Sequence, residues 1–96
     1  WIKMPTGLIV QWGTVQITAL PTTVSFAIVF PNNCLDIVVS EGAANSGTWG
    51  IGAPTLHGTG IKTASNYQGW SLGWNGSGWA APSGGGITQN YIAIGY

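Results

Sequence analysis

The sequence predicts an all-β protein built as an antiparallel β-sandwich. Apolar residues recur at every second position in several short runs, and no stretch shows the 3.6-residue period of an amphipathic helix. Glycine, proline and asparagine separate these runs at short intervals, as in sandwiches with many tight turns. With 96 residues, the chain is expected to form a single domain, 1–96.

The first predicted strand region covers residues 8–18. Its apolar positions are even as far as Trp12 and odd from Val15 onward. Because side chains alternate between the two faces of a strand, this change of parity predicts a bulge or tight turn at Gly13. Trp12 is expected to be a packing residue.

The clearest alternation covers residues 24–30, where every even position is apolar: Val24, Phe26, Ile28 and Phe30. Pro31 and two asparagines then end the strand, because proline cannot donate to a ladder and asparagine tolerates turn dihedrals. The next apolar face consists of Leu35, Ile37 and Val39. These two runs are predicted to form an antiparallel hairpin through the Pro-Asn turn.

The second half of the chain is less regular. After a loose segment at 42–60, a strand is predicted within 61–72, with four residues on one face: Ile61, Thr63, Ser65 and Tyr67. Residues 69–86 contain seven glycines and three tryptophans without a period, which predicts a long loop or a loosely paired hairpin tip. The last strand, 91–96, aligns Ile92, Ile94 and Tyr96 and is expected to be paired up to its final residue.

Charged residues are scarce, since the chain has two lysines, two acidic residues and one histidine. The lysines and acidic residues make up 4% of the sequence, where a soluble domain has about 25%. A folded monomer of this mass exposes roughly 5,200 Å², which leaves about 1,300 Å² for each charge. Such a surface predicts an obligate oligomer or a part of a larger assembly.

The composition also argues against several functions. With two lysines and no arginine, the chain lacks the positive charge that phosphate binding requires, so no nucleic-acid partner is expected. No apolar run is long enough for a membrane-spanning helix and no signal peptide is visible, so membrane insertion is not expected. The start at Trp1 rather than methionine indicates a fragment or a processed product.

Few residues could carry catalysis or hold a metal. Cys34 is the single cysteine and is expected to be a small buried apolar residue. Asp36 and Glu41 would lie about 16 Å apart on opposite faces of one strand, whereas paired glycosidase carboxylates lie roughly 5–9.5 Å apart. His57 is expected to be hydrogen-bonded or exposed; a metal site on a three-fold axis and a ligand contact are the alternatives. We therefore expect no enzyme activity, no cofactor and no metal.

Three separated motifs carry a family resemblance. They are GLIVQWG at 7–13, a phenylalanine-rich segment at 24–34 that includes FPN and Cys34, and IAIGY at the end. In this order they resemble the C-terminal receptor-binding domain of bacteriophage tail fibres, a group that ends in an aromatic residue followed by IAIGY. Tyr91 stands where that group more often has tryptophan. The resemblance implies a homotrimer of β-sandwiches at the tip of a virion's tail fibre, docking on the bacterial surface, and it supplies no catalytic residues.

The glycine-rich segment contains the candidate receptor-binding residues. Indole rings can cover the C–H faces of sugars, and neighbouring amides can hydrogen-bond sugar hydroxyls without any charge. The candidates are Trp70, Trp74, Asn75 and Trp79, with Trp49 as a weaker member of the group. The expected receptor is a bacterial surface polysaccharide or another outer-membrane receptor. The same rings could instead fill the sandwich or the seam between subunits, in which case the domain would be a structural trimerisation module without receptor binding.

Overall fold

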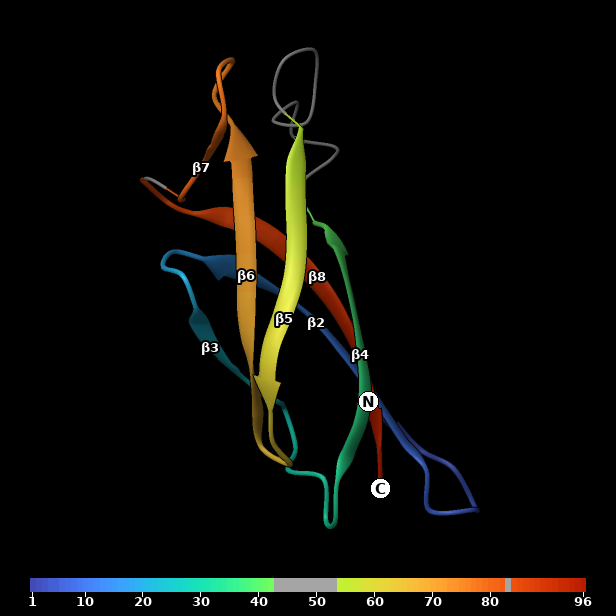
Figure 1. Cartoon of the computed structure of the whole chain (residues 1–96). Coiled ribbons are helices and arrows are strands. Elements are labelled where there is room, and N and C mark those ends of the chain that lie inside the picture. The colour runs from blue at the N-terminus through green and yellow to red at the C-terminus, as the bar shows by residue number, and fades with distance from the viewer. Residues whose placement is uncertain (43–53, 83) are drawn as a thin grey trace.

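The computed structural model describes residues 1–42, 54–82 and 84–96, and these residues form two antiparallel sheets (Figure 1). Sheet A contains, in spatial order, β1 (Ile2–Lys3), β2 (Ile9–Ile17), β8 (Ile87–Gly95) and β4 (Cys34–Glu41). Sheet B contains β3 (Thr22–Ser25), β6 (Asn66–Trp74) and β5 (Thr55–Lys62), and β7 (Trp79–Ala80) pairs with the end of β6. The described part of the chain has no helix that could cross a membrane. The all-β, antiparallel prediction is confirmed.

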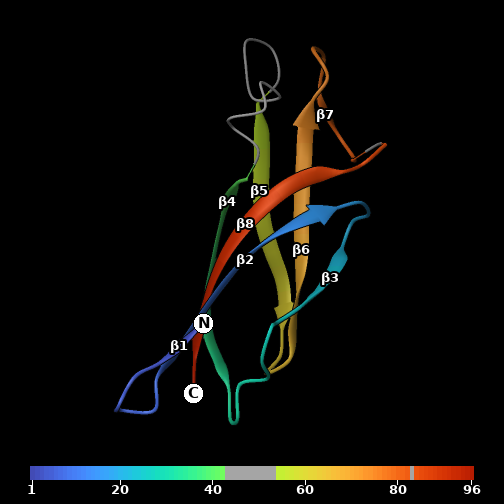
Figure 2. The same cartoon turned by 180° about the vertical axis from the view of Figure 1, so that it is seen from behind.

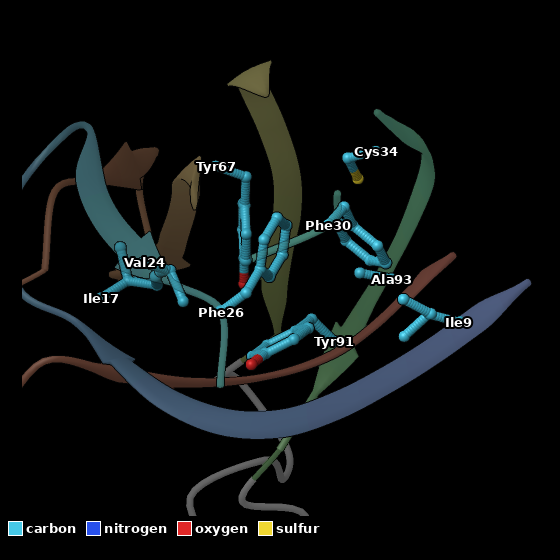
Figure 3. Close-up of a cluster of buried hydrophobic side chains, with 9 residues drawn as sticks. All are labelled: Ile9, Ile17, Val24, Phe26, Phe30, Cys34, Tyr67, Tyr91 and Ala93. Carbon is cyan, nitrogen blue, oxygen red and sulfur yellow. The ribbon is translucent and has the colours of Figure 1, made fainter. Parts of the chain in front are cut away.

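The core lies between the two sheets and is centred on aromatic rings (Figure 3). The Tyr67 ring, from sheet B, packs edge-on against the Tyr91 ring, from sheet A, with centroids 5.3 Å apart. Phe26 contacts both tyrosines and also meets Phe30 edge-on at 5.2 Å. The remaining buried hydrophobic residues surround these rings: Ile9, Ile17, Val24, Cys34 and Ala93. Cys34 is thus a buried apolar residue, as predicted.

The predicted change of face at Gly13 does not occur. β2 pairs with β8 from Ile9 to Ile17 without a register shift, so its odd positions face the core throughout. Gly13 lacks a side chain because the Tyr91 ring occupies that space, and a Cβ there would lie 2.8 Å from the ring carbon Cε1. Trp12 consequently points outward and is 56% exposed, so it does not pack within this chain.

A buried glutamine explains why the apolar positions at the start of β2 predicted the wrong buried face. Gln11 is completely buried, and its amide makes two hydrogen bonds to the backbone of Ile28: Nε2 donates to the carbonyl at 2.7 Å, and Oε1 accepts from the N–H at 3.0 Å. A buried polar side chain is tolerated when its hydrogen bonds are satisfied in this way. The same two bonds take the place of strand pairing at Ile28. The predicted strand 24–30 therefore ends at Ser25, although Phe26 and Phe30 still point inward.

The predicted hairpin between residues 24–30 and 35–39 is also wrong. β3 belongs to sheet B and β4 to sheet A, so the Pro-Asn segment connects the two sheets instead of turning within one. A register shift between Cys34 and Asp36 leaves Leu35 exposed, while Ile37 and Val39 pack against the core. The turn residues also hold the C-terminus: the Tyr96 N–H donates to the Asn33 carbonyl at 3.0 Å. The expectation that the chain is paired up to its last residue is confirmed.

Two boundaries in the second half differ from the prediction. β5 ends at Lys62, and a turn interrupts the strand that was expected within 61–72. Thr63 builds this turn, because its N–H donates to the Asn66 carbonyl at 2.8 Å and its hydroxyl accepts from the Asn66 N–H at 3.1 Å. β6 then continues to Trp74, so residues 69–74 form a strand and not a loop. The predicted hairpin tip is confined to residues 75–78, between β6 and β7.

Candidate functional site

Three of the predicted tryptophans lie on the outer face of sheet B and on the hairpin that extends it. Along β6, the buried residues Tyr67 and Ser71 face the core, so Trp70 and Trp74 face outward. Trp79 on β7 stands directly opposite Trp74, and the two rings meet edge to face with centroids 5.4 Å apart and an interplanar angle of 71°. This hairpin lies at the end of the molecule opposite the two termini (Figure 1).

Asn75 shapes the turn that joins the two paired rings. Its N–H donates to the Gly78 carbonyl at 3.0 Å, and its side-chain Oδ1 accepts from the N–H groups of Ser77 and Gly78, both at 2.9 Å. Gly76 has a φ of +96°, a conformation that favours glycine. The oxygen of Asn75 is therefore used within the turn, and only its amide nitrogen is left to face a ligand.

Two shallow hollows accompany the tryptophans. The first, of about 300 Å³, lies between the hairpin and the start of β8 and is lined by Trp74, Asn75, Pro82 and Ile87 among others. The second, of about 250 Å³, lies beside Trp70. Trp70 and Trp74 are four residues apart on one strand, which separates them by about 13 Å. The structure thus brings Trp74, Asn75 and Trp79 together and leaves Trp70 as a second contact point on the same face; Trp49 lies outside the described residues.

Trp70 lies beside the part of β5 that contains two glycines. It pairs in register with Gly58, and a Cβ at Gly60 would lie 2.9 Å from its indole Nε1. Leu56 and Leu72 form the wall of the neighbouring hollow. The absence of a side chain at Gly60 therefore allows the indole to lie against the sheet, with 39% of the residue still exposed.

A buried polar network lies beneath this face and holds β6 in place. The Gln89 Nε2 donates to the Trp70 carbonyl at 3.1 Å and to the Ser71 hydroxyl at 3.2 Å, and its Oε1 accepts from the Tyr67 hydroxyl at 2.9 Å. These three bonds fix the two sheets relative to each other directly under Trp70. Burial raises the pKa of Tyr67 well above its ordinary value, and the nearby Tyr91 raises it further.

The single histidine belongs to the same network. Its Nδ1 lies 2.8 Å from the Ser71 hydroxyl, and its Nε2 lies 3.0 Å from the Thr55 hydroxyl and 3.4 Å from the Glu41 carboxylate. His57 is thus hydrogen-bonded, as expected, and it connects β4 with β5 and β6. The order serine, histidine, carboxylate resembles a hydrolase triad, but Ser71 is only 1% exposed and its hydroxyl also accepts from Gln89. The Ser71 hydroxyl is thus buried in the folded chain and is used within the network.

The two acidic side chains lie on opposite faces of β4, as predicted. Asp36 pairs with Ile94 on the outer face, whereas Glu41 pairs with Gln89 on the inner face and contacts His57. Among residues 1–42, 54–82 and 84–96, no three histidine, cysteine or acidic residues gather where they could hold a metal ion.

Sequence reasoning did not identify one exposed surface, the outer face of sheet A. A hollow of about 390 Å³ lies there, with Trp12 and Val38 as apolar walls and Asn90 and Ser40 as polar ones. The sequence contains a signal for which strand face is buried. Gln11 lies two positions from Gly13, and Gln89 lies two positions from Tyr91, so each glutamine shares the inward face of its strand with that residue. The signal was hidden because glutamine is usually read as a surface residue.

The fold is similar to those of solved pyocin tail fibres. The fold is similar to an N-truncated R2-type pyocin tail fibre, with a TM-score of 0.68 and 23% identity over 95% of this chain and 31% of that chain. It is also similar to a C-terminal portion of the R2 pyocin fibre of P. aeruginosa (TM-score 0.67, 22% identity, 95% of this chain and 21% of that chain). An N-truncated R1-type pyocin tail fibre gives a TM-score of 0.61 with 24% identity, covering 95% of this chain and 73% of that chain.

A sequence relative is an uncharacterised protein of Methanocaldococcus jannaschii, 46% identical over 44 residues. That match covers 42% of this chain and 29% of the relative, so the chain spans less than a third of the relative's length. Residues 3–96 match the family described as "tail fiber protein gp53-like, C-terminal". The chain therefore belongs to this family of tail-fibre C-terminal domains, and its fold is similar to that of pyocin tail fibres.

Proposed function

We propose that this domain is the receptor-binding tip of the fibre, acts as a homotrimer without enzymatic activity, and recognises a neutral glycan of the bacterial surface. The observation that carries the proposal is the Trp74–Trp79 pair, two partly exposed indoles held edge to face on a short hairpin. Aromatic rings that are fixed in this way lose little conformational freedom when a ligand binds. The neighbouring Asn75 amide and backbone groups of the turn can hydrogen-bond sugar hydroxyls.

The charge pattern supports a neutral ligand. The hairpin residues 74–80 include no charged side chain, so an anionic polymer finds no cation there. A single shallow site would bind weakly, but three sites on each tip and several fibres on each particle would raise the avidity. Weak individual contacts are therefore compatible with firm attachment to a cell.

The site is tested by replacing each ring and measuring glycan-array binding and adsorption to host cells. Trp74→Ala and Trp79→Ala are expected to weaken binding about 30-fold, which corresponds to the roughly 2 kcal/mol lost with a central aromatic contact. Trp1→Ala is the matched control, because Trp1 is also exposed and lies outside the hairpin. If both hairpin variants bind like the parent, the hairpin is not the receptor site.

The alternative is a structural module that trimerises the fibre end without binding a receptor. The apolar outer face of sheet A favours this role, because it offers a surface for assembly that is separate from the hairpin. Deleting the turn 75–78 distinguishes the two functions. Adsorption would be lost if the hairpin binds the receptor, and it would be retained if the domain only assembles the fibre.

A further inference from the structure

The outer face of sheet A carries a continuous apolar surface that no described segment covers. In Figure 2, β2 and β8 lie in front of β5 and β6, so this face is turned toward the viewer. Two rows of side chains that are paired across the strands form this surface, and we call them the sheet A rows. The first row is Trp12, Ile92 and Val38, and the second is Ile2, Val10 and Ile94. Trp12, Ile92 and Val38 are 56%, 49% and 60% exposed.

Four polar side chains beside this surface are hydrogen-bonded in pairs within the chain. The Thr14 hydroxyl donates to Asn90 Oδ1 at 2.7 Å, and the Gln16 Nε2 donates to the Thr88 hydroxyl at 2.8 Å. Among the outward ladder positions of sheet A, Asp36 is the single charged residue, and its Oδ1 already accepts from the adjacent backbone N–H at 2.9 Å. The face therefore offers no charge pattern by which a charged partner could be selected.

The size of the apolar surface matches the centre of a protein interface. The exposed parts of the six side chains of the sheet A rows amount to on the order of 400–500 Å². The largest apolar patch on a typical monomer is about 300–600 Å², and a stable interface buries about 800 Å² on each partner. The rows thus supply the apolar centre of such an interface, and the hydrogen-bonded polar side chains beside them supply its rim.

We propose that copies of this chain pack against one another through the sheet A rows. Apart from Asp36, this face is uncharged and apolar with an amide- and hydroxyl-bearing margin. Three copies can turn it toward a common three-fold axis, where each face contacts both neighbouring copies. With two lysines and two acidic residues over 5555 Å² of surface, the rest of the molecule supplies little charge to direct a foreign partner to this face. The number of copies, three, rests on the proposed function. The outer face of sheet B and the tryptophan hairpin then remain open to a ligand.

The first test needs no variant. The protein is oxidised with limiting N-bromosuccinimide, and the modified tryptophans are quantified by mass spectrometry. Trp12 is expected to react at least 10-fold more slowly than Trp79, although it is the more exposed of the two in the single chain, at 56% against 44%. If Trp12 is oxidised as fast as Trp79, its face is open to solvent and the proposal fails.

The second test compares lysine substitutions on the two sheets by light scattering. Ile92→Lys on sheet A and Leu56→Lys on sheet B form a matched pair, because both residues are 49% exposed on an outer face. The parent and Leu56→Lys are expected near three chain masses, and Ile92→Lys near one. Val38→Lys, on the edge strand β4, is a second sheet A variant in case the first does not fold. Parental mass in both sheet A variants, or dissociation of Leu56→Lys as well, would overturn the inference.

Receptor binding is measured separately on the same proteins, so the two proposals can fail independently. A trimer that is disrupted by the sheet A substitutions but shows no glycan binding would keep this inference and remove the receptor assignment. A monomeric parent that binds glycan through Trp74 would remove this inference together with the proposed homotrimer, and would keep the receptor assignment.

Discussion

Gly95, the glycine of the C-terminal IAIGY motif, is predicted to be irreplaceable by alanine. A Cβ at this position would overlap the backbone carbonyl oxygen of Asn33 and would lie 2.6 Å and 2.8 Å from two atoms of the Phe30 ring. Neither neighbour can move easily. Phe30 is fully buried in the core, and Asn33 is held by reciprocal hydrogen bonds with the Tyr96 backbone, at 2.9 Å and 3.0 Å.

The expected cost follows from these contacts. Overpacking a core by a methyl group costs about 1–3 kcal/mol, and displacement of the turn would also weaken backbone hydrogen bonds worth about 1 kcal/mol each. We therefore expect Gly95→Ala to lower the free energy of unfolding by about 3–5 kcal/mol. In a domain of this size that corresponds to a fall in Tm of at least about 12 °C.

The assay is urea unfolding at one fixed protein concentration, because any self-association adds to the apparent stability. Gly58→Ala is the matched control, since Gly58 also lies in a strand, but a Cβ added there would meet no atom within 4 Å. It is expected to be neutral or to stabilise by up to about 1 kcal/mol. If Gly95→Ala unfolds within about 0.5 kcal/mol of the parent, the steric reasoning is wrong.

Two further predictions concern buried polar groups. Gln11→Met keeps the side-chain volume but leaves the N–H and carbonyl of Ile28 without partners, so it should cost about 2–4 kcal/mol in urea unfolding; a cost below 1 kcal/mol would contradict this role. Alkaline pH should also destabilise the fold, because burial raises the folded-state pKa of Tyr67 and Tyr91 above the ordinary value of about 10. Below pH 10 both phenols are neutral in both states and the stabilisation is complete. As pH rises above 10, the unfolded chain loses protons first, and stability should fall by up to about 1.4 kcal/mol per pH unit for each tyrosine. Unfolding free energies that stay constant from pH 9 to 11.5 would refute this.

Much of the fold could be predicted from local pattern. The period-two alternation, the glycine and proline breaks and the closing motif led to an all-β antiparallel protein of the tail-fibre group. The hairpin at 75–78 was also predictable, because Asn75 and Gly76 are residues that tight turns favour. The edge-to-face contact of Trp74 and Trp79 was not, since it depends on the register between β6 and β7.

The class of the fold and the family follow from the amino-acid sequence alone, because they depend on local alternation and on separated motifs. Which face of each strand is buried was decided only by the tertiary structure. Periodicity shows that two faces alternate, but the burial of Gln11 and the outward position of Trp12 depend on hydrogen bonds and ring contacts with residues far along the chain. Gln11 can lie inside because Ile28 satisfies its amide, and the Tyr91 ring requires Gly13 beside it. Those partners are brought together by the pairing of β2 with β8 and the packing of the two sheets, which no local pattern encodes.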